Sequence, residues 1–80
     1  MAVRKVLLSY PENLIQEPVL FRMASRFNVM PNIRRARVTA TTGEIALELE
    51  GAPEDLANGI AFLEEAGVLV EPIEGDIVSP

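Results

Sequence analysis

Few residues of this chain have side chains suited to catalysis. The sequence contains neither histidine nor cysteine, which excludes a nucleophile with a histidine base and a thiolate nucleophile. The neighbouring carboxylates Glu48 with Glu50, and Glu64 with Glu65, could act as acid and base. Both pairs fall on faces predicted to be exposed, where carboxylates are usually solvated surface groups. We therefore predict no catalytic residue and no enzyme activity.

Cofactor sites are equally poorly represented. A zinc site of thiolates or imidazoles is impossible without cysteine and histidine. The chain has no aspartate-rich loop with EF-hand spacing and no glycine-rich phosphate loop. A metal site made of oxygen ligands alone stays open as an alternative. We predict no cofactor and assign no metal ligand.

The cluster of Arg34, Arg35 and Arg37 is the one basic concentration in the sequence. On a mixed α and β fold it could indicate an RNA-recognition module, which stacks bases on aromatic side chains of its central strands. The predicted central strands offer Leu7 and Ala46 instead of aromatic residues. Pairing of the arginines with glutamates across a hairpin is the favoured interpretation.

Asn32 has two interpretations. It can satisfy backbone groups where the chain enters a strand after Pro31, a common task of asparagine in loops. It can also present its amide at the mouth of a ligand or dimer groove. From the residues alone the first interpretation is favoured. Arg34 falls on the helix side of the predicted strand, near its start, from where it could reach the rim and meet a carboxylate.

Length and composition limit the class of protein. Eighty residues, 49% of them hydrophobic, make one domain with a single core. A domain this small without disulfides is commonly stabilised by oligomerisation, so we expect a homo-oligomer, a dimer or larger. The net charge of −5 disfavours binding to nucleic acids and anionic membranes. No apolar run is long enough to insert into a bilayer, and the absence of cysteine is compatible with the cytoplasm.

Periodicity predicts four strands and two helices. The first helix starts at Pro18 and buries a stripe of Leu20, Met23, Ala24 and Phe27 before stopping at Asn28. The second starts near Pro53, buries Leu56, Ile60 and Leu63, and ends before Gly67. The predicted strands are Val3–Tyr10, which has apolar residues on both faces and is therefore central, Asn32–Thr41, Glu44–Glu50 and Val68–Ile73. Gly75 to Pro80 is predicted to be a tail, in which Ile77-Val78 could pair with the edge of a partner.

The middle two strands are predicted to form a hairpin. A two-residue turn at Thr42-Gly43 places Val38 opposite Leu47 and Ala36 opposite Leu49. A longer loop that keeps the same faces is the alternative. The expected charge pairs in this register are Arg37 with Glu48 and Arg35 with Glu50.

The order of elements predicts a ferredoxin-like βαββαβ fold, in the α+β class, over a single domain of residues 1–80 with its core at about 3–74. Right-handed crossovers place both helices on one face of a four-stranded antiparallel sheet. Close packing of the second helix on the sheet would explain Gly59 within it. The open face is a candidate interface, with Leu7, Arg35, Arg37 and Ala46 as its predicted residues.

The segments in this order resemble the NIL domain family over about residues 3 to 74. Asn32-Ile33, which opens the second strand, matches the start of the motif for which the family is named, and Arg34 stands where that motif has leucine. The other matching segments are Phe27-Asn28-Val29, Glu50-Gly51, Ile60-Ala61-Phe62-Leu63 and Gly67-Val68-Leu69-Val70-Glu71.

The resemblance implies a function. NIL domains are ferredoxin-like, tend to dimerise, and occur at the C-terminus of methionine-import ATPases, where they bind methionine and inhibit transport. Others are joined to iron–sulfur ferredoxin modules. The resemblance implies a regulatory module with an amino-acid ligand at a dimer interface and Asn32, Ile33 and Arg34 as ligand-binding residues. Because the sequence contains neither an ATPase nor a cysteine motif, we expect a free-standing version of the domain. The alternative is a protein-interaction subunit that docks onto a sulfur-metabolism enzyme or a transporter.

Overall fold

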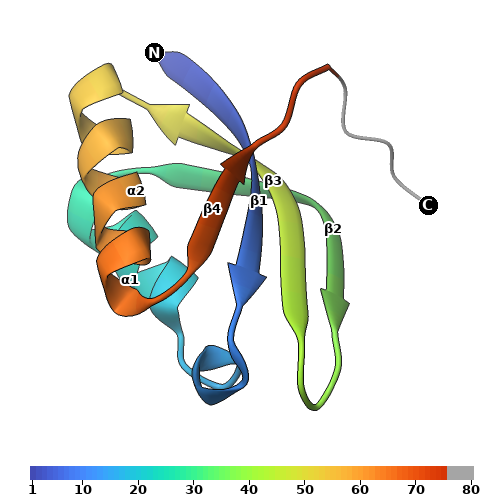
Figure 1. The fold of residues 1–80 in the computed structure, drawn as a ribbon. Helices are drawn as coiled ribbons and strands as arrows, with labels where there is room; N and C mark the ends of the chain where they lie inside the picture. Colours follow the sequence, from blue (N-terminus) through green and yellow to red (C-terminus); the bar gives the residue numbers. More distant parts are fainter. Residues whose placement is uncertain (76–80) are drawn as a thin grey trace.

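The structure, a computed structural model, describes residues 1–75. Two helices lie on one face of a four-stranded antiparallel sheet with strand order β2-β3-β1-β4 (Figure 1). This is the predicted ferredoxin-like fold, with the first strand in the interior of the sheet. In chain order the elements are β1 (Ala2–Tyr10), a 3-10 turn η1 (Glu12–Leu14), α1 (Val19–Phe27), β2 (Met30–Val38), β3 (Gly43–Gly51), α2 (Pro53–Ala66) and β4 (Leu69–Pro72). The predicted pairing of Ile77-Val78 lies outside the described residues.

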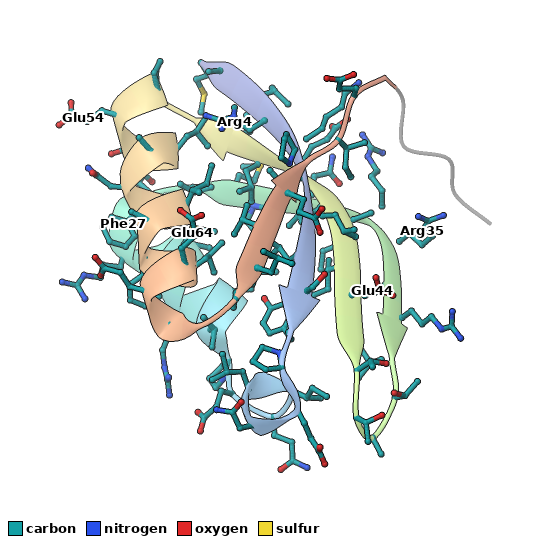
Figure 2. The ribbon with its side chains drawn as sticks, viewed as in Figure 1. Arg4, Phe27, Arg35, Glu44, Glu54 and Glu64 are labelled. Atoms are coloured by element: carbon teal, nitrogen blue, oxygen red, sulfur yellow. The ribbon has the colours of Figure 1, made fainter. Side chains whose placement is uncertain are left out.

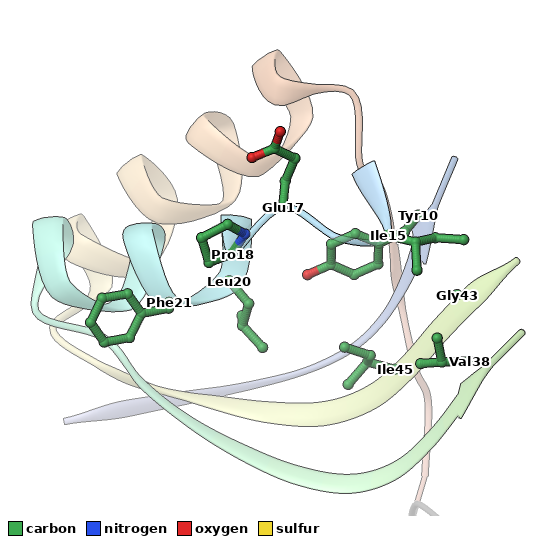
Figure 3. A pocket seen from close by; sticks show the side chains of 9 residues that line it. All are labelled: Tyr10, Ile15, Glu17, Pro18, Leu20, Phe21, Val38, Gly43 and Ile45. Carbon is green, nitrogen blue, oxygen red and sulfur yellow. The ribbon is translucent and has the colours of Figure 1, made fainter. Parts of the chain in front are cut away.

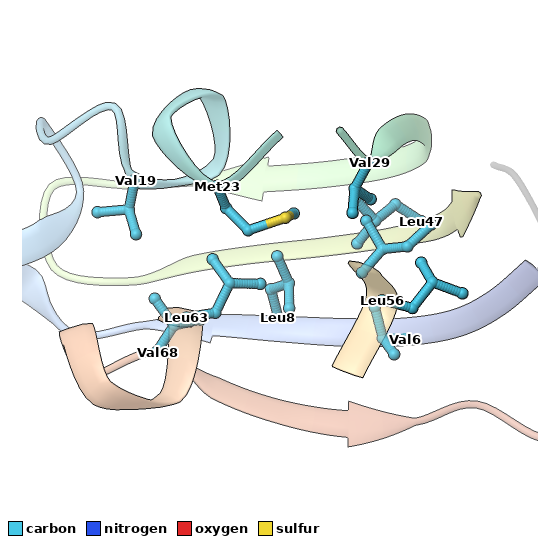
Figure 4. Close-up of a cluster of buried hydrophobic side chains, with 10 residues drawn as sticks. Val6, Leu8, Val19, Met23, Val29, Leu47, Leu56, Leu63 and Val68 are labelled. Atoms are coloured by element: carbon cyan, nitrogen blue, oxygen red, sulfur yellow. The ribbon is translucent and has the colours of Figure 1, made fainter. Parts of the chain in front are cut away.

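The core lies between the sheet and the two helices (Figure 4). Strand β1 shows how the alternation builds it, because Val6 and Leu8 are buried while Leu7 between them is half-buried on the open face. Helix α1 contributes Val19 and Met23, the latter with no exposed surface. The other buried members of this core are Val29, Leu47, Leu49, Leu56, Leu63 and Val68.

Both helices end where the sequence predicted. Asn28 follows α1 in the left-handed conformation at φ 57°, which asparagine tolerates better than most residues. Gly67 follows α2 at φ 107°, a value that favours glycine. Its N–H donates to the Glu64 carbonyl at 3.0 Å, which satisfies one of the carbonyls at the helix end.

The predicted hairpin register is wrong. Val38 is opposite Gly43 instead of Leu47, because the connection is the four-residue loop 39–42. Thr39 holds this loop together. Its hydroxyl accepts from the N–H of Thr42 at 3.0 Å, and its own N–H donates to the Thr42 carbonyl at 2.8 Å. Local hydrogen bonds of this kind from a threonine stabilise turns that composition alone does not indicate.

The charge pairs predicted from that register are wrong as well. Arg37 is opposite Glu44, and Arg35 is opposite Ala46. The pairing slips between Ile33 and Arg35, so that Arg34 is the extra residue of a β-bulge. Its guanidinium does not turn to the helix side, as predicted, but donates to the Glu48 carboxylate at 3.1 Å. Both side chains are partly exposed, which limits the pair to about 1 kcal/mol or less.

Gly59 packs closely, but against α1 and not against the sheet. A Cβ atom at this position would lie 2.8 Å from Sδ of Met23 and 3.5 Å from Cγ2 of Val29. Met23 is completely buried and cannot move into solvent to make room. The absence of a side chain at residue 59 therefore allows α1 and α2 to approach, and the prediction named the wrong neighbour.

The Gly59→Ala variant tests this contact. Alanine improves helix propensity by about 1 kcal/mol, but overpacking a filled core costs about 1–3 kcal/mol. Because the buried Met23 side chain must shift to accommodate the added methyl group, we expect a net loss of roughly 1 kcal/mol in the free energy of unfolding, measured by urea denaturation. Asn58→Ala, at an exposed position of the same helix, is the matched control and should not destabilise. A more stable Gly59→Ala protein would contradict the packing argument.

Candidate functional site

An apolar cleft lies between the start of α1 and the helix side of the β2–β3 hairpin (Figure 3). Its volume is about 150 Å³. No helix covers this end of the hairpin, and Val38 there is 61% exposed. On the α1 side of the cleft, Phe21 is 70% exposed. Its apolar lining consists of Ile15, Pro18, Leu20, Phe21, Val38 and Ile45.

Tyr10 brings a polar group to this cleft. Its ring lies at the end of β1, and Figure 3 shows its hydroxyl directed toward the interior of the cleft, between Leu20 and Ile45. The hydroxyl oxygen is buried and has no hydrogen-bond partner among residues 1–75. A buried polar group without a partner costs about 1–3 kcal/mol. The site thus has one unsatisfied hydrogen-bonding group in apolar surroundings.

Burial also changes the titration of the Tyr10 hydroxyl. Desolvation disfavours the phenolate and raises the pKa of Tyr10 from 10.0 to about 12. A tyrosine hydroxyl is protonated at physiological pH even at its ordinary pKa, and the raised pKa extends that range, so the group can donate a hydrogen bond.

No charged group points into the cleft among the residues that line it. Glu17 lines the mouth, but its carboxylate points away from the interior (Figure 3). It lies 3.6 Å from the guanidinium of Arg22, and both side chains are about half exposed. The interior thus suits an uncharged, largely apolar group.

The residues predicted to bind a ligand lie elsewhere. Asn32 is exposed and opposite Glu48, which places it on the open face of the sheet with the Arg34–Glu48 ion pair. Ile33 is opposite Leu47, on the helix side, and is 53% exposed. None of these three predicted residues lines the cleft.

The predicted interface residues do come together. Leu7, Arg35, Arg37 and Ala46 line one hollow of about 340 Å³ on the open face, joined by Glu44. Arg35 and Arg37 extend from β2 toward the side of the sheet opposite the helices (Figure 2 labels Arg35 and Glu44). The hollow combines an apolar floor with two positive charges and one negative charge.

The sequence reasoning missed the cleft. Tyr10 was treated only as the end of a strand, and Val38 was expected in the core. One signal was available, because Phe21 is apolar but falls outside the buried stripe of the first helix. Such a residue is informative when it extends an exposed apolar patch, as Phe21 does beside the other apolar residues of the cleft.

Two other kinds of site were searched for within residues 1–75. No group of three or more acidic side chains lies close enough together to hold a metal ion in this part of the chain. No helix in the same range is long and apolar enough to cross a membrane.

The raised pKa of Tyr10 is directly measurable, because this is the only tyrosine and the chain has no tryptophan. We expect tyrosinate absorbance to appear with a midpoint near pH 12 in the folded protein and near pH 10 in denaturant. Because the pKa of Tyr10 is higher in the folded than in the unfolded protein, its contribution to the free energy of unfolding should be fully present below pH 10. That contribution should be lost as the pH rises toward 12. Tyr10→Phe should weaken this loss. A folded midpoint near 10 would contradict the burial of the hydroxyl.

Comparison with known proteins places the chain in a family. The family model described as "NIL domain" matches residues 4–72. A methionine import ATP-binding protein of Bacillus cereus is 31% identical over 70 residues, covering 82% of this chain and 20% of that protein. One from Symbiobacterium thermophilum is 34% identical over 73 residues, covering 86% of this chain and 22% of that protein. The chain thus spans about a fifth of the length of these relatives.

A solved structure has the same fold. The C-terminal domain of an ABC transporter ATP-binding protein from Enterococcus faecalis superposes with a TM-score of 0.77. The match covers 91% of this chain and 86% of that one, at 17% identity. Because the family model extends over most of the sequence, from β1 into β4, this chain belongs to the NIL domain family.

Proposed function

We propose that this chain is a non-enzymatic regulatory module that binds methionine or a related amino acid at a dimer interface. The observation that carries the proposal is an apolar cleft of side-chain size in a NIL domain. The similar full-length proteins are named methionine import ATP-binding proteins, which supports a ligand of this class. Their ATP-binding role also supports a cytoplasmic location for this module.

The size of the cleft favours an amino-acid side chain. A volume of about 150 Å³ matches an apolar cavity that accommodates a molecule such as benzene. Pockets for drug-sized ligands and cofactors are larger, at about 300–1,000 Å³. An unbranched apolar side chain can enter, while the ammonium and carboxylate groups of the amino acid stay at the mouth, where water or a partner can contact them.

A dimer would reconcile the cleft with the residues that the family resemblance indicates. Within one copy, Asn32 and Arg34 lie on the open face and the cleft lies on the helix side. A single ligand can contact both sets only if they come from two copies. Exposed Ile33, Val38 and Phe21 provide apolar surface next to the cleft for such an association.

A thermal-shift screen with amino acids tests the proposal. At 100 times its dissociation constant, a ligand adds about 2.7 kcal/mol to the free energy of unfolding, so methionine should raise the melting temperature by roughly 10–20 °C. Val38→Phe fills the cleft from an exposed position and should abolish the shift. Val3→Phe, at a similarly exposed position on the open face, is the matched control.

The same screen tests the dimer and the predicted polar contacts. Asn32→Ala should weaken the shift while leaving the unliganded melting temperature unchanged, since Asn32 is exposed. Light scattering with and without methionine should give the mass of a dimer. No shift with any amino acid, or binding by a monomer that Asn32→Ala leaves intact, would reject the proposal in this form.

A second candidate function is docking onto a transporter or an enzyme of sulfur metabolism. The hollow formed by Leu7, Arg35, Arg37, Glu44 and Ala46 favours it, because charged residues around an apolar floor are typical of protein interfaces. Capture of a purified methionine-import ATPase should then depend on Arg37 and Arg35 and not on Asn32. Capture that survives Arg35→Ala with Arg37→Ala would reject this hollow as the docking surface.

A further inference from the structure

We infer that Tyr10 determines which side chains the cleft accepts, by donating a hydrogen bond to an acceptor atom near the end of an otherwise apolar ligand side chain. This inference rests on the proposed function and names the ligand chemistry of the same site. It assigns to a residue of β1 a specificity role that neither the NIL motif nor the basic cluster of β2 suggested.

The position of the hydroxyl supports this role. It is buried, it has no protein partner within residues 1–75, and it is directed into the cleft (Figure 3). The neighbouring lining side chains, Leu20 and Ile45, have no polar atoms with which to satisfy it. Because the oxygen has less than 1 Å² of accessible surface, a ligand atom reaches this donor when a lining side chain such as Leu20 moves aside.

The hydrogen bond of this hydroxyl determines which of two ligands of equal shape binds more tightly. A hydrocarbon side chain in the cleft leaves the hydroxyl without a partner, whereas an acceptor at the same place forms a hydrogen bond with it. Specificity of this kind arises because a buried polar group of the site stays unpaired with the wrong ligand. The cleft should therefore discriminate between side chains that differ only in one acceptor atom.

Methionine and norleucine form the required pair, since a thioether sulfur in one replaces a methylene in the other. The sulfur is a weak acceptor, so the preference for methionine should be modest. Methionine sulfoxide carries a much stronger acceptor, its sulfoxide oxygen, on the same chain. We expect methionine to bind more tightly than norleucine, and we expect the affinity for methionine sulfoxide, whose oxygen must leave water, to depend most strongly on Tyr10.

The first experiment measures the affinity of the intact chain for these three ligands. The fluorescence of Tyr10 reports binding directly, because the chain contains one tyrosine and no tryptophan. A hydrogen bond worth about 0.5–1.5 kcal/mol corresponds to roughly 2- to 12-fold in affinity, and we expect methionine at the lower end of this range over norleucine. Equal affinities of all three ligands would overturn the inference.

The second experiment repeats the titrations by calorimetry with Tyr10→Phe. Removing the hydroxyl should weaken methionine sulfoxide most and make methionine and norleucine equal. Norleucine should bind at least as well as to the unaltered protein, because the unpaired hydroxyl is gone. This gain excludes a merely structural effect, which would weaken every ligand alike. Unchanged discrimination in Tyr10→Phe would also overturn the inference.

The outcomes separate this inference from the function on which it rests. Binding of the three ligands without discrimination, abolished by Val38→Phe, would support the proposed site and reject the role of Tyr10. Absence of binding by any of them to a folded protein, as judged by circular dichroism, would reject the ligand-binding function and the inference with it.

Discussion

The difference in rise between a helix and a strand governs the layout of this domain. Helix α1 and strands β2 and β3 each have nine residues. At about 1.5 Å per residue the helix is roughly 14 Å long, whereas each strand at about 3.3 Å per residue spans roughly 30 Å. The short helix cannot cover the whole hairpin, and α2, with 14 residues, packs mainly on α1 and makes smaller contacts with β4, β3 and β1. The cleft lies over the part of the hairpin that neither helix covers.

The fold was predictable because its signals are periodic. Alternation in β1, the residues at both helix ends and the order of elements all pointed to the same arrangement. The hairpin register was not predictable, because the alternation of side chains between the two faces is unchanged when the pairing shifts by an even number of residues. Val38 is opposite Gly43 and not Leu47, a shift of four positions that keeps the faces and changes every partner. Hydrogen bonds made by Thr39 stabilise the four-residue loop that connects the strands in this register.

The hollow on the open face and the cleft were predictable to different degrees, because only the hollow depends on the alternation of side chains along strands. Leu7, Arg35, Arg37 and Ala46 were assigned to one face by parity, and they line one hollow. A β-bulge at Arg34 breaks parity, and its side chain accordingly lies on the unexpected face. The cleft depends on what fails to cover a surface. Whether a surface is covered depends on the relative lengths of elements that are distant in sequence, and no local sequence pattern indicates it.

The irregular shape of strand β2 also bears on aggregation of the protein. It is a nine-residue strand at the edge of the sheet, and long open edges invite indiscriminate pairing with other chains and, finally, fibre formation. Pro31 lacks the N–H that a further strand would need, and the bulge at Arg34 interrupts the straight ladder. Positive side chains along the same strand repel a copy of itself. The irregularity that displaced one arginine thus also protects a small, acidic protein from aggregation.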